Sequence, residues 1–183
     1  MAHLDTILAV AAEQLPAARV DCILIGGFAV NHHGYTRNTL DVDFMILAEK
    51  LDSVREIMKQ AGFTNVSIRE NVAFFAMPGA PLRVDFLRVD GGTMRKLLDH
   101  AIEVNIRGYN LKVPALRDLI AMKIFALSQD VERRMGKDLP DIAYLTVMNN
   151  LDLESDVRPL CDRFGTPETY ELIRKQVEGL RTS

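Results

Sequence analysis

The sequence predicts an α+β fold in which a mixed β-sheet is flanked by helices and followed by a C-terminal helical segment. Short apolar runs that end at glycine pairs or turn residues fill the first half of the chain. Helical spacing of apolar residues dominates the second half. The 48% hydrophobic and 26% charged content over 183 residues is typical of globular proteins. We therefore expect one folding unit, made of a core over residues 1–113 and a helical segment over residues 114–183.

The first half reads as alternating helices and strands. Leu4, Ile7, Leu8, Ala11 and Leu15 recur at helical spacing and predict an amphipathic first helix. Apolar runs bounded by turn residues predict strands over residues 20–25, 40–47, 66–69, 72–77 and 82–89. Helices are expected over residues 28–33, ending at Gly34, and over residues 50–60, ending at Gly62.

From Gly92 onward the chain is expected to be mostly helical. Gly91-Gly92 reads as turn punctuation, and a small extended piece over residues 103–113 has its turn at Gly108. Helices are expected near residues 116–134, 139–149, 154–163 and 169–181.

Bulk properties restrict the protein class more than the partner. A net charge of −3 argues against a surface that grips nucleic acid over its whole extent, although a local basic patch stays possible. Cys22 and Cys161 have no metal-ligand spacing, are too few for a disulfide scaffold, and have no base partner in the sequence. The apolar start lacks a basic flank and is too short for a membrane span, so we expect a cytoplasmic protein.

Asp41 and Asp43 are the first candidates for a chemical role. Residues two apart on a strand face the same way, so both carboxylates project from one face while Val42 and Phe44 project from the other. Closely packed carboxylates repel each other, and a hard divalent cation such as Mg²⁺ neutralises them. The alternative is a solvated strand end.

Three neighbouring features favour the site. Gly26-Gly27 ends a buried strand and opens a helix, where backbone N–H groups can approach phosphate; the alternative is a plain tight turn. Arg37 and Thr39 place a guanidinium and a hydroxyl just before the aspartates. Asp85 stands inside an apolar strand and is a third ligand candidate, unless it pairs with Arg83, Arg88 or another basic group.

The pattern of Gly26-Gly27, thirteen further residues, Asp41-Val42-Asp43 and a later strand Asp85 resembles the DNA polymerase beta-type nucleotidyltransferase superfamily. The longer run from Ile25 to Asp43 resembles its small bacterial branch, which includes abortive-infection (AbiEii-like) toxin transferases. The resemblance covers about residues 20–145. It implies a nucleotidyltransferase core in which Asp41, Asp43 and Asp85 hold magnesium, with two ions expected, on a nucleoside triphosphate such as ATP.

Lys123 is a further candidate, because it falls inside the apolar stripe of the helix after Pro114. There it should snorkel, meet a buried acid, or meet a phosphate. It matches the lysine that completes the site in the resembling branch, and we expect the helical segment to pack on the core and complete the site. The roles of Arg133, Arg134, Lys137, Asp138 and Asp141 stay open. His32 and His33 diverge on a helix and are expected to pack or face solvent.

Together these features predict a Mg-dependent nucleotidyltransferase that moves a nucleoside monophosphate to an acceptor hydroxyl and releases pyrophosphate. Gly26, Gly27, Arg37, Thr39 and Lys123 would bind the nucleotide, and Asp41, Asp43, Asp85 and Lys123 would serve catalysis. The acceptor could be an RNA end, a protein or a small molecule, and a role in toxin–antitoxin or phage-defence systems, with an antitoxin partner, is compatible. The alternatives are a catalytically silent nucleotide-binding partner of a toxin–antitoxin pair and a structural helical protein with fortuitous acids.

Overall fold

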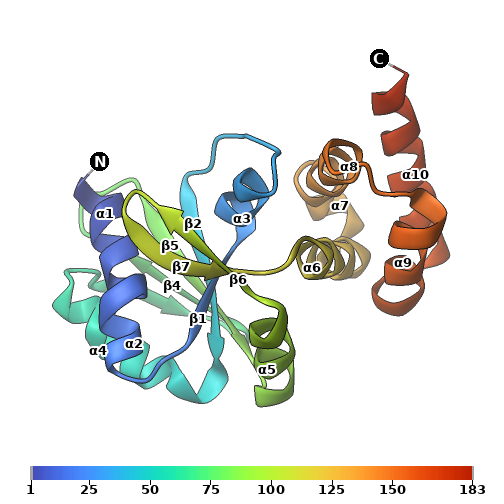
Figure 1. The fold of residues 1–183 in the computed structure, drawn as a ribbon. Coiled ribbons are helices and arrows are strands. Elements are labelled where there is room, and N and C mark those ends of the chain that lie inside the picture. The colour runs from blue at the N-terminus through green and yellow to red at the C-terminus, as the bar shows by residue number, and fades with distance from the viewer. Residues whose placement is uncertain (1, 183) are drawn as a thin grey trace. The chain divides into compact units, whose positions relative to one another are not determined.

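The computed structural model describes residues 2–182 (Figure 1). The strands are β1 Cys22–Ile25, β2 Asp41–Leu47, β3 Asn65–Ile68, β4 Val72–Ala76, β5 Arg83–Val89, β6 Ile102–Ile106 and β7 Tyr109–Val113. The α-helices are α1 Ala2–Ala9, α2 Leu15–Ala17, α3 Gly26–His32, α4 Leu51–Gln60, α5 Gly91–His100, α6 Leu116–Gln129, α7 Val131–Arg134, α8 Asp138–Met148, α9 Arg158–Phe164 and α10 Pro167–Arg181. Two π-helical segments, η1 Val10–Gln14 and η3 Leu153–Val157, and the 3₁₀ turn η2 Ala48–Lys50 complete the elements.

Internal contacts divide the chain into two compact units. The first comprises Met1–Ala29 and Asn38–Ala115, and the second comprises Val30–Arg37 and Leu116–Ser183. The second unit is therefore not a simple C-terminal piece, because a short segment from the first half of the sequence belongs to it.

The first unit is built on a five-stranded mixed sheet with the order β1-β2-β5-β4-β3. The two central strands β2 and β5 run parallel, and the other neighbours pair antiparallel. Along β2, Val42, Phe44 and Ile46 are buried while Asp41 and Asp43 are only half-buried, which is the alternation expected of a strand with one covered face. The mixed α+β architecture is as the sequence predicts.

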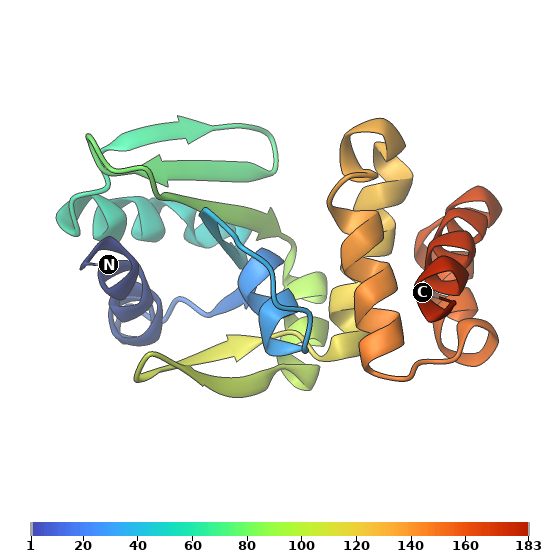
Figure 2. The same ribbon diagram turned by 90° about the horizontal axis from the view of Figure 1, so that it is seen from above.

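Aromatic side chains on the covered face form the centre of this core. The ring of Phe86 on β5 lies 5.5 Å from Phe44 and 5.5 Å from Phe75, stacked on the first and edge-on to the second. All three side chains are almost fully buried, so they hold the central strands β2, β5 and β4 in register. The N-terminal helical segment contacts both α4 and β7, and Figures 1 and 2 show α1 beside α4 and beside the β6–β7 hairpin.

The second unit is helical. Helix α8 packs against α6 and α10, and α9 packs against α6 and α10 (Figure 1). The segment Val30–Arg37 joins it through Tyr35, whose ring stacks 4.2 Å from that of Tyr144, and through the His33 carbonyl, which accepts a hydrogen bond from the Asn149 amide.

Two helix predictions are wrong in detail. The expected helix over residues 116–134 is broken at Asp130, whose non-helical backbone (φ −155°, ψ 79°) and side-chain bond to the Arg133 N–H start the new helix α7. Gly91-Gly92, predicted to be a turn, forms the first turn of α5. The carboxylate of Asp90 accepts from the Gly92 and Thr93 N–H groups and so caps a helix that glycines alone would disfavour.

Within the described residues, no helix is both long enough and apolar enough to span a membrane.

Candidate active site

The parallel pair β2 and β5 brings three acids to one face of the sheet. Asp43 lies directly opposite Asp85 in the strand register, and Asp41 lies opposite Arg83. Because alternate residues of a strand share a face, Asp41, Asp43, Arg83 and Asp85 occupy the face opposite the buried Phe44 and Phe86. The structure thus places the three predicted ligand residues together on the first unit.

Arg83 links two of these carboxylates. Its Nε and Nη2 donate to Asp85 at 2.7 Å and 2.9 Å, and Nη2 also donates to Asp41 Oδ2 at 3.2 Å. The sequence left open a salt bridge between Asp85 and Arg83, and that pair is present. A single guanidinium therefore lies where two acids converge.

The carboxyl group of Asp85 has a raised pKa. Burial raises the pKa of Asp85; the hydrogen bond and charge of Arg83 oppose this shift, while the negative charges of Asp43 and Asp41 add to it. The balance leaves the pKa of Asp85 above its usual value. Crowding of like charges is thus part of the geometry, and a further cation on this face would relieve it.

Gly26 and Gly27 allow α3 to begin against the acids. Gly26 has a φ of +63°, and a Cβ added there would lie 2.0 Å from Asp43 Oδ2. A Cβ at Gly27 would lie 2.7 Å from Thr39 Oγ1. Any side chain at either position would collide with Asp43 or Thr39, so the two glycines are needed for this close approach.

Thr39 is also tied to the β2 strand. Its hydroxyl donates to the backbone carbonyl of Asp41 at 3.0 Å, which fixes the chain where the strand begins. Leu40, between them, is 78% exposed. Thr39 therefore has a structural contact, and its hydroxyl oxygen lies beside the start of α3.

Arg37 belongs to the second unit and is held at both its backbone and its side chain. The Asn31 side chain accepts from the Arg37 N–H and donates to its carbonyl, each at 3.0 Å. The guanidinium forms a bidentate pair with Asp141 at 2.6 Å and 2.8 Å. That hydrogen bond raises the pKa of Arg37, so the side chain is a permanent cation fixed in one orientation.

Lys123 completes the same ion network. Its ammonium lies 2.8 Å from Asp138 and 2.7 Å from Asp141, and only 7% of its side chain is exposed. Of the three environments that the sequence allows for Lys123, the structure has the buried acid. Arg134 adds a second partner for Asp138 at 3.2 Å, so Arg134, Asp138 and Asp141, whose roles the sequence left open, belong to this network.

Asp141 is the centre of the network. Its burial alone would raise the pKa of this carboxyl, but the hydrogen bond from Arg37 and the charge and hydrogen bond of Lys123 outweigh burial and hold the pKa below its usual value. The side chain is 1% exposed, and such a buried carboxylate is stable only while both cations stay in place.

The sequence did not predict that Arg83 contacts Asp41 as well as Asp85, or that the Asn31 side chain bonds to the backbone of Arg37. Arg83 could have been found from strand period, because it stands two residues before Asp85 on the same strand. Asn31 offers no such signal, since its contact depends on the turn after α3. The rings of His32 and His33 lie edge-on, 5.2 Å apart, and no cluster of three or more His, Cys, Asp or Glu residues in the described chain has metal-binding geometry as placed.

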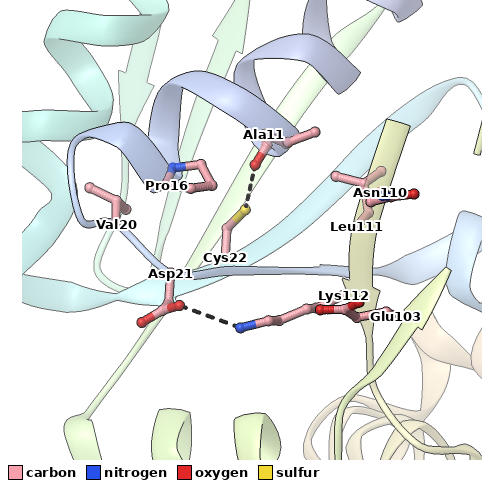
Figure 3. Close-up of a pocket in the computed structure, with 10 residues that line it drawn as sticks. Ala11, Pro16, Val20, Asp21, Cys22, Glu103, Asn110, Leu111 and Lys112 are labelled. Carbon is pink, nitrogen blue, oxygen red and sulfur yellow. Dashed lines mark hydrogen bonds and ion pairs between the residues drawn. The ribbon is translucent and has the colours of Figure 1, made fainter. Parts of the chain in front are cut away.

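The two cysteine thiols are not part of the candidate site. Cys22 and Cys161 are free and buried, and burial raises the pKa of each to about 12. The Cys22 thiol donates to the Ala11 carbonyl at 3.6 Å beside a cavity of about 220 Å³ (Figure 3). Asp21 and Lys112 pair at 3.6 Å on the wall of this cavity. None of the predicted site residues lines it, so it is separate from the acidic face.

The fold is shared with solved nucleotidyltransferases. An antigenic nucleotidyltransferase-like protein from Paracoccidioides brasiliensis is 19% identical, with a TM-score of 0.58 over 93% of this chain and 92% of that one. ANT(2″)-Ia, solved in complex with adenylyl-2″-tobramycin, is 12% identical, with a TM-score of 0.58 over 97% and 99% of the two chains. The lincomycin-bound lincosamide antibiotic adenylyltransferase LnuA is 12% identical, with a TM-score of 0.55 over 78% and 95%. The chain therefore has the fold of these solved nucleotidyltransferases.

The sequence places the chain more narrowly within that class. Residues 9–180 match the model of the family described as "Nucleotidyl transferase AbiEii toxin, Type IV TA system". The chain belongs to this AbiEii nucleotidyltransferase family. No curated protein matches it.

Proposed function

We propose that the chain is a metal-dependent nucleotidyltransferase that moves a nucleoside monophosphate from a nucleoside triphosphate to an acceptor hydroxyl and releases pyrophosphate. The observation that carries the proposal is the convergence of Asp41, Asp43 and Asp85 on one face of β2 and β5. The free, buried thiols fit a reducing compartment such as the cytoplasm.

The residue types suit magnesium, but with Arg83 between them the three acids do not form a metal-binding cluster as placed. Carboxylate oxygens are the ligands that this hard ion prefers, and Arg83 already occupies the space between two of them as a stand-in cation. Asp41, Asp43 and Asp85 would hold the metal, with two ions expected by resemblance. Bound metal would supply charge neutralisation of the phosphates and activation of the acceptor hydroxyl.

The remaining residues of the first unit would bind and position the nucleotide. Gly26 and Gly27 would give the phosphates access to backbone N–H groups at the start of α3, and Thr39 would add a hydroxyl beside them. Asp85 would accept the proton of the acceptor hydroxyl, as the family resemblance implies.

Arg37 and Lys123 belong to the second unit, and their predicted roles in nucleotide binding stay predictions. The guanidinium of Arg37 already forms a bidentate pair with Asp141. The ammonium of Lys123 is already paired with Asp138 and Asp141, so we assign it a positioning role, in which it holds Asp141 and thereby the guanidinium of Arg37.

The proposal also covers the acceptor and the biological setting. An RNA end, a protein hydroxyl and a small molecule are the candidate acceptors. Membership of a family described as type IV toxins supports action within a toxin–antitoxin system that has an antitoxin partner.

A second candidate is a catalytically silent nucleotide-binding partner protein. The observation that favours it is Arg83, whose guanidinium occupies the position between Asp41 and Asp85. Such a protein would bind nucleotide but would release no pyrophosphate with any acceptor.

The test is incubation of the protein with each labelled nucleoside triphosphate, magnesium, and total cellular RNA or lysate, followed by identification of the labelled species. Pyrophosphate release is measured in parallel, and Asp43→Asn is the matched control because it keeps the size of the side chain while removing its charge. We expect labelled acceptor with the wild-type protein and none with Asp43→Asn. Incorporation by Asp43→Asn at the wild-type rate would show that the carboxylates are not the site.

A further inference from the structure

We propose that Arg83 is an exchangeable counter-cation of the acidic face: its guanidinium holds the space between Asp41 and Asp85 until a divalent ion binds, and then leaves the carboxylates. The inference rests on the proposed function, because it concerns the metal that these acids would bind. It assigns to Arg83 a direct influence on metal affinity.

Arg83 and a divalent ion would compete for the same carboxylate oxygens. Arg83 Nη2 lies 3.2 Å from Asp41 Oδ2 and 2.9 Å from Asp85 Oδ2, so one nitrogen bridges both carboxylates. A magnesium ion needs its oxygen ligands at about 2.0–2.1 Å. A metal bridging these two oxygens and the bridging nitrogen would occupy the same space, and two cations there would repel each other. Occupation by Arg83 and by metal is therefore mutually exclusive.

The ion pair between Arg83 and Asp41 is exposed enough to open. The side chain of Arg83 is 46% exposed, against 31% for Asp41 and 13% for Asp85, and an ion pair with one exposed partner is weaker than a fully buried one. The Arg37–Asp141 pair is different, because its carboxylate is 1% exposed and is held by Lys123 as well. Arg83 is thus the labile cation, whereas Arg37 is the fixed one.

Arg83 has a second contact that does not depend on the acids. Its Cζ lies 5.0 Å from the centroid of the Phe74 ring, within the range of a cation–π interaction. Phe74 is the register partner of Asp85 on β4, so the ring stands beside the carboxylate. A guanidinium released from Asp85 can keep its contact with Phe74, which lowers the cost of leaving.

The test measures binding of Mn²⁺ alone, without nucleotide, by titration calorimetry and by the electron paramagnetic resonance signal of the free ion. Wild type is compared with Arg83→Gln and with Arg69→Gln. Arg69 is an exposed residue whose guanidinium also lies over Phe74, at 5.5 Å, whereas the ion pairs of Asp41 and Asp85 among the described residues are with Arg83. Both substitutions remove one positive charge near the same ring, so they separate direct competition from general electrostatics.

We expect Arg83→Gln to bind Mn²⁺ about tenfold more tightly than wild type and Arg69→Gln to stay within about twofold of wild type, because only the first change frees the carboxylate oxygens. Equal or weaker binding by Arg83→Gln would overturn the inference, since Arg83 would then organise the acids for metal. An equal gain in both variants would also overturn it.

Asp43→Asn separates this inference from the proposed function. If wild-type Mn²⁺ binding is lost in Asp43→Asn but Arg83→Gln gains nothing, the carboxylate site stands and only the role of Arg83 fails. If Mn²⁺ binding is undetectable in wild type and Arg83→Gln alike, or survives Asp43→Asn unchanged in both backgrounds, the metal site of the proposed function fails, and the role of Arg83 with it.

Discussion

At the residue scale, Gly26 shows how one missing side chain shapes the acidic face. Replacing it with alanine places a Cβ in a backbone conformation with φ of +63° and 2.0 Å from Asp43 Oδ2. We expect Gly26→Ala to displace Asp43 and to weaken Mn²⁺ binding about tenfold or more, in addition to a stability loss of about 1 kcal/mol or more from the positive φ. Calorimetric titration and urea denaturation measure the two effects.

Gly79→Ala is the matched control for this prediction. Gly79 has a φ of +75°, but a Cβ there would have no atom within 4 Å. This variant should therefore lose stability through backbone strain alone and should bind Mn²⁺ like wild type. Equal metal affinity in the two variants would contradict the assignment of Gly26 to the site.

Lys123 carries the second prediction at this scale. Lys123→Met would deprive Asp138 and Asp141 of a cation that is 2.8 Å and 2.7 Å away in a buried setting. Breaking such a pair from one side costs about 3–5 kcal/mol of stability, measured by urea denaturation at neutral pH. Arg134→Met removes a partner of Asp138 that is 38% exposed and should cost less than about 1 kcal/mol. Similar losses in both variants would contradict the network.

The same network sets a pH dependence for the lysine variant. In the wild-type protein the pKa of Asp141 is lowered below its ordinary value of 3.8, so its contribution to stability is present above pH 3.8 and is lost as pH falls toward the lowered pKa. Lys123→Met removes one cause of that lowering. The stability difference between wild type and variant should therefore shrink as pH falls below 3.8, and a gap that stays constant with pH would argue against this origin.

At the element scale, the strands could be predicted from sequence and some helix boundaries could not. Buried runs such as Cys22–Ile25 and the alternating β2 carry their own signal in residue type and period. The sequence signal at the start of helix α5 is misleading, because Gly91-Gly92 is typical of a turn. The helix begins there because the side chain of Asp90 caps it, and composition does not reveal that geometry. The break before α7 has the same cause, a capping aspartate at residue 130.

Helix α5 supplies a prediction at this scale. Asp90→Ala removes the acceptor for the Gly92 and Thr93 N–H groups, and for the Thr93 hydroxyl at 2.7 Å. Loss of an N-cap costs about 1 kcal/mol, and two glycines in the first turn leave the helix little propensity to compensate. Urea denaturation should show this loss for Asp90→Ala and a much smaller one for Asp90→Asn, which keeps an acceptor oxygen. Equal stability of Asp90→Ala and wild type would show that the cap contributes nothing.

The candidate site, too, could be predicted from the sequence only in part. That Asp41 and Asp43 share a face follows from strand period alone, and the apolar strand around Asp85 predicts that this acid needs a partner. The pairing of Lys123 with Asp138 joins residues 15 positions apart, and the pairing of Asp141 with Arg37 joins residues 104 positions apart. Sequence shows that Lys123 is placed in an apolar stripe, but only the packing of α6 against α8 decides which anion it meets.

At the scale of the whole molecule, the segment Val30–Arg37 has to be included in any fragment that is meant to reproduce the second unit. Three contacts tie it there: the Tyr35–Tyr144 stack, the Arg37–Asp141 pair and the bond from Asn149 to His33. A fragment that begins at Leu116 lacks all three, and leaves the buried carboxylate of Asp141 with Lys123 as its remaining cation.

We therefore expect the fragment over residues 116–183 to be markedly less stable than the same helices in the full chain, because a buried acid that loses a bidentate guanidinium is costly. Far-ultraviolet circular dichroism with urea denaturation measures the helical transition of each. Arg37→Met in the full chain is the matched variant: it removes the same ion pair while keeping Tyr35 and His33, so its stability should fall between those of the fragment and the wild type. A fragment that unfolds at the same urea concentration as the full chain would show that Val30–Arg37 contributes nothing to the helical unit.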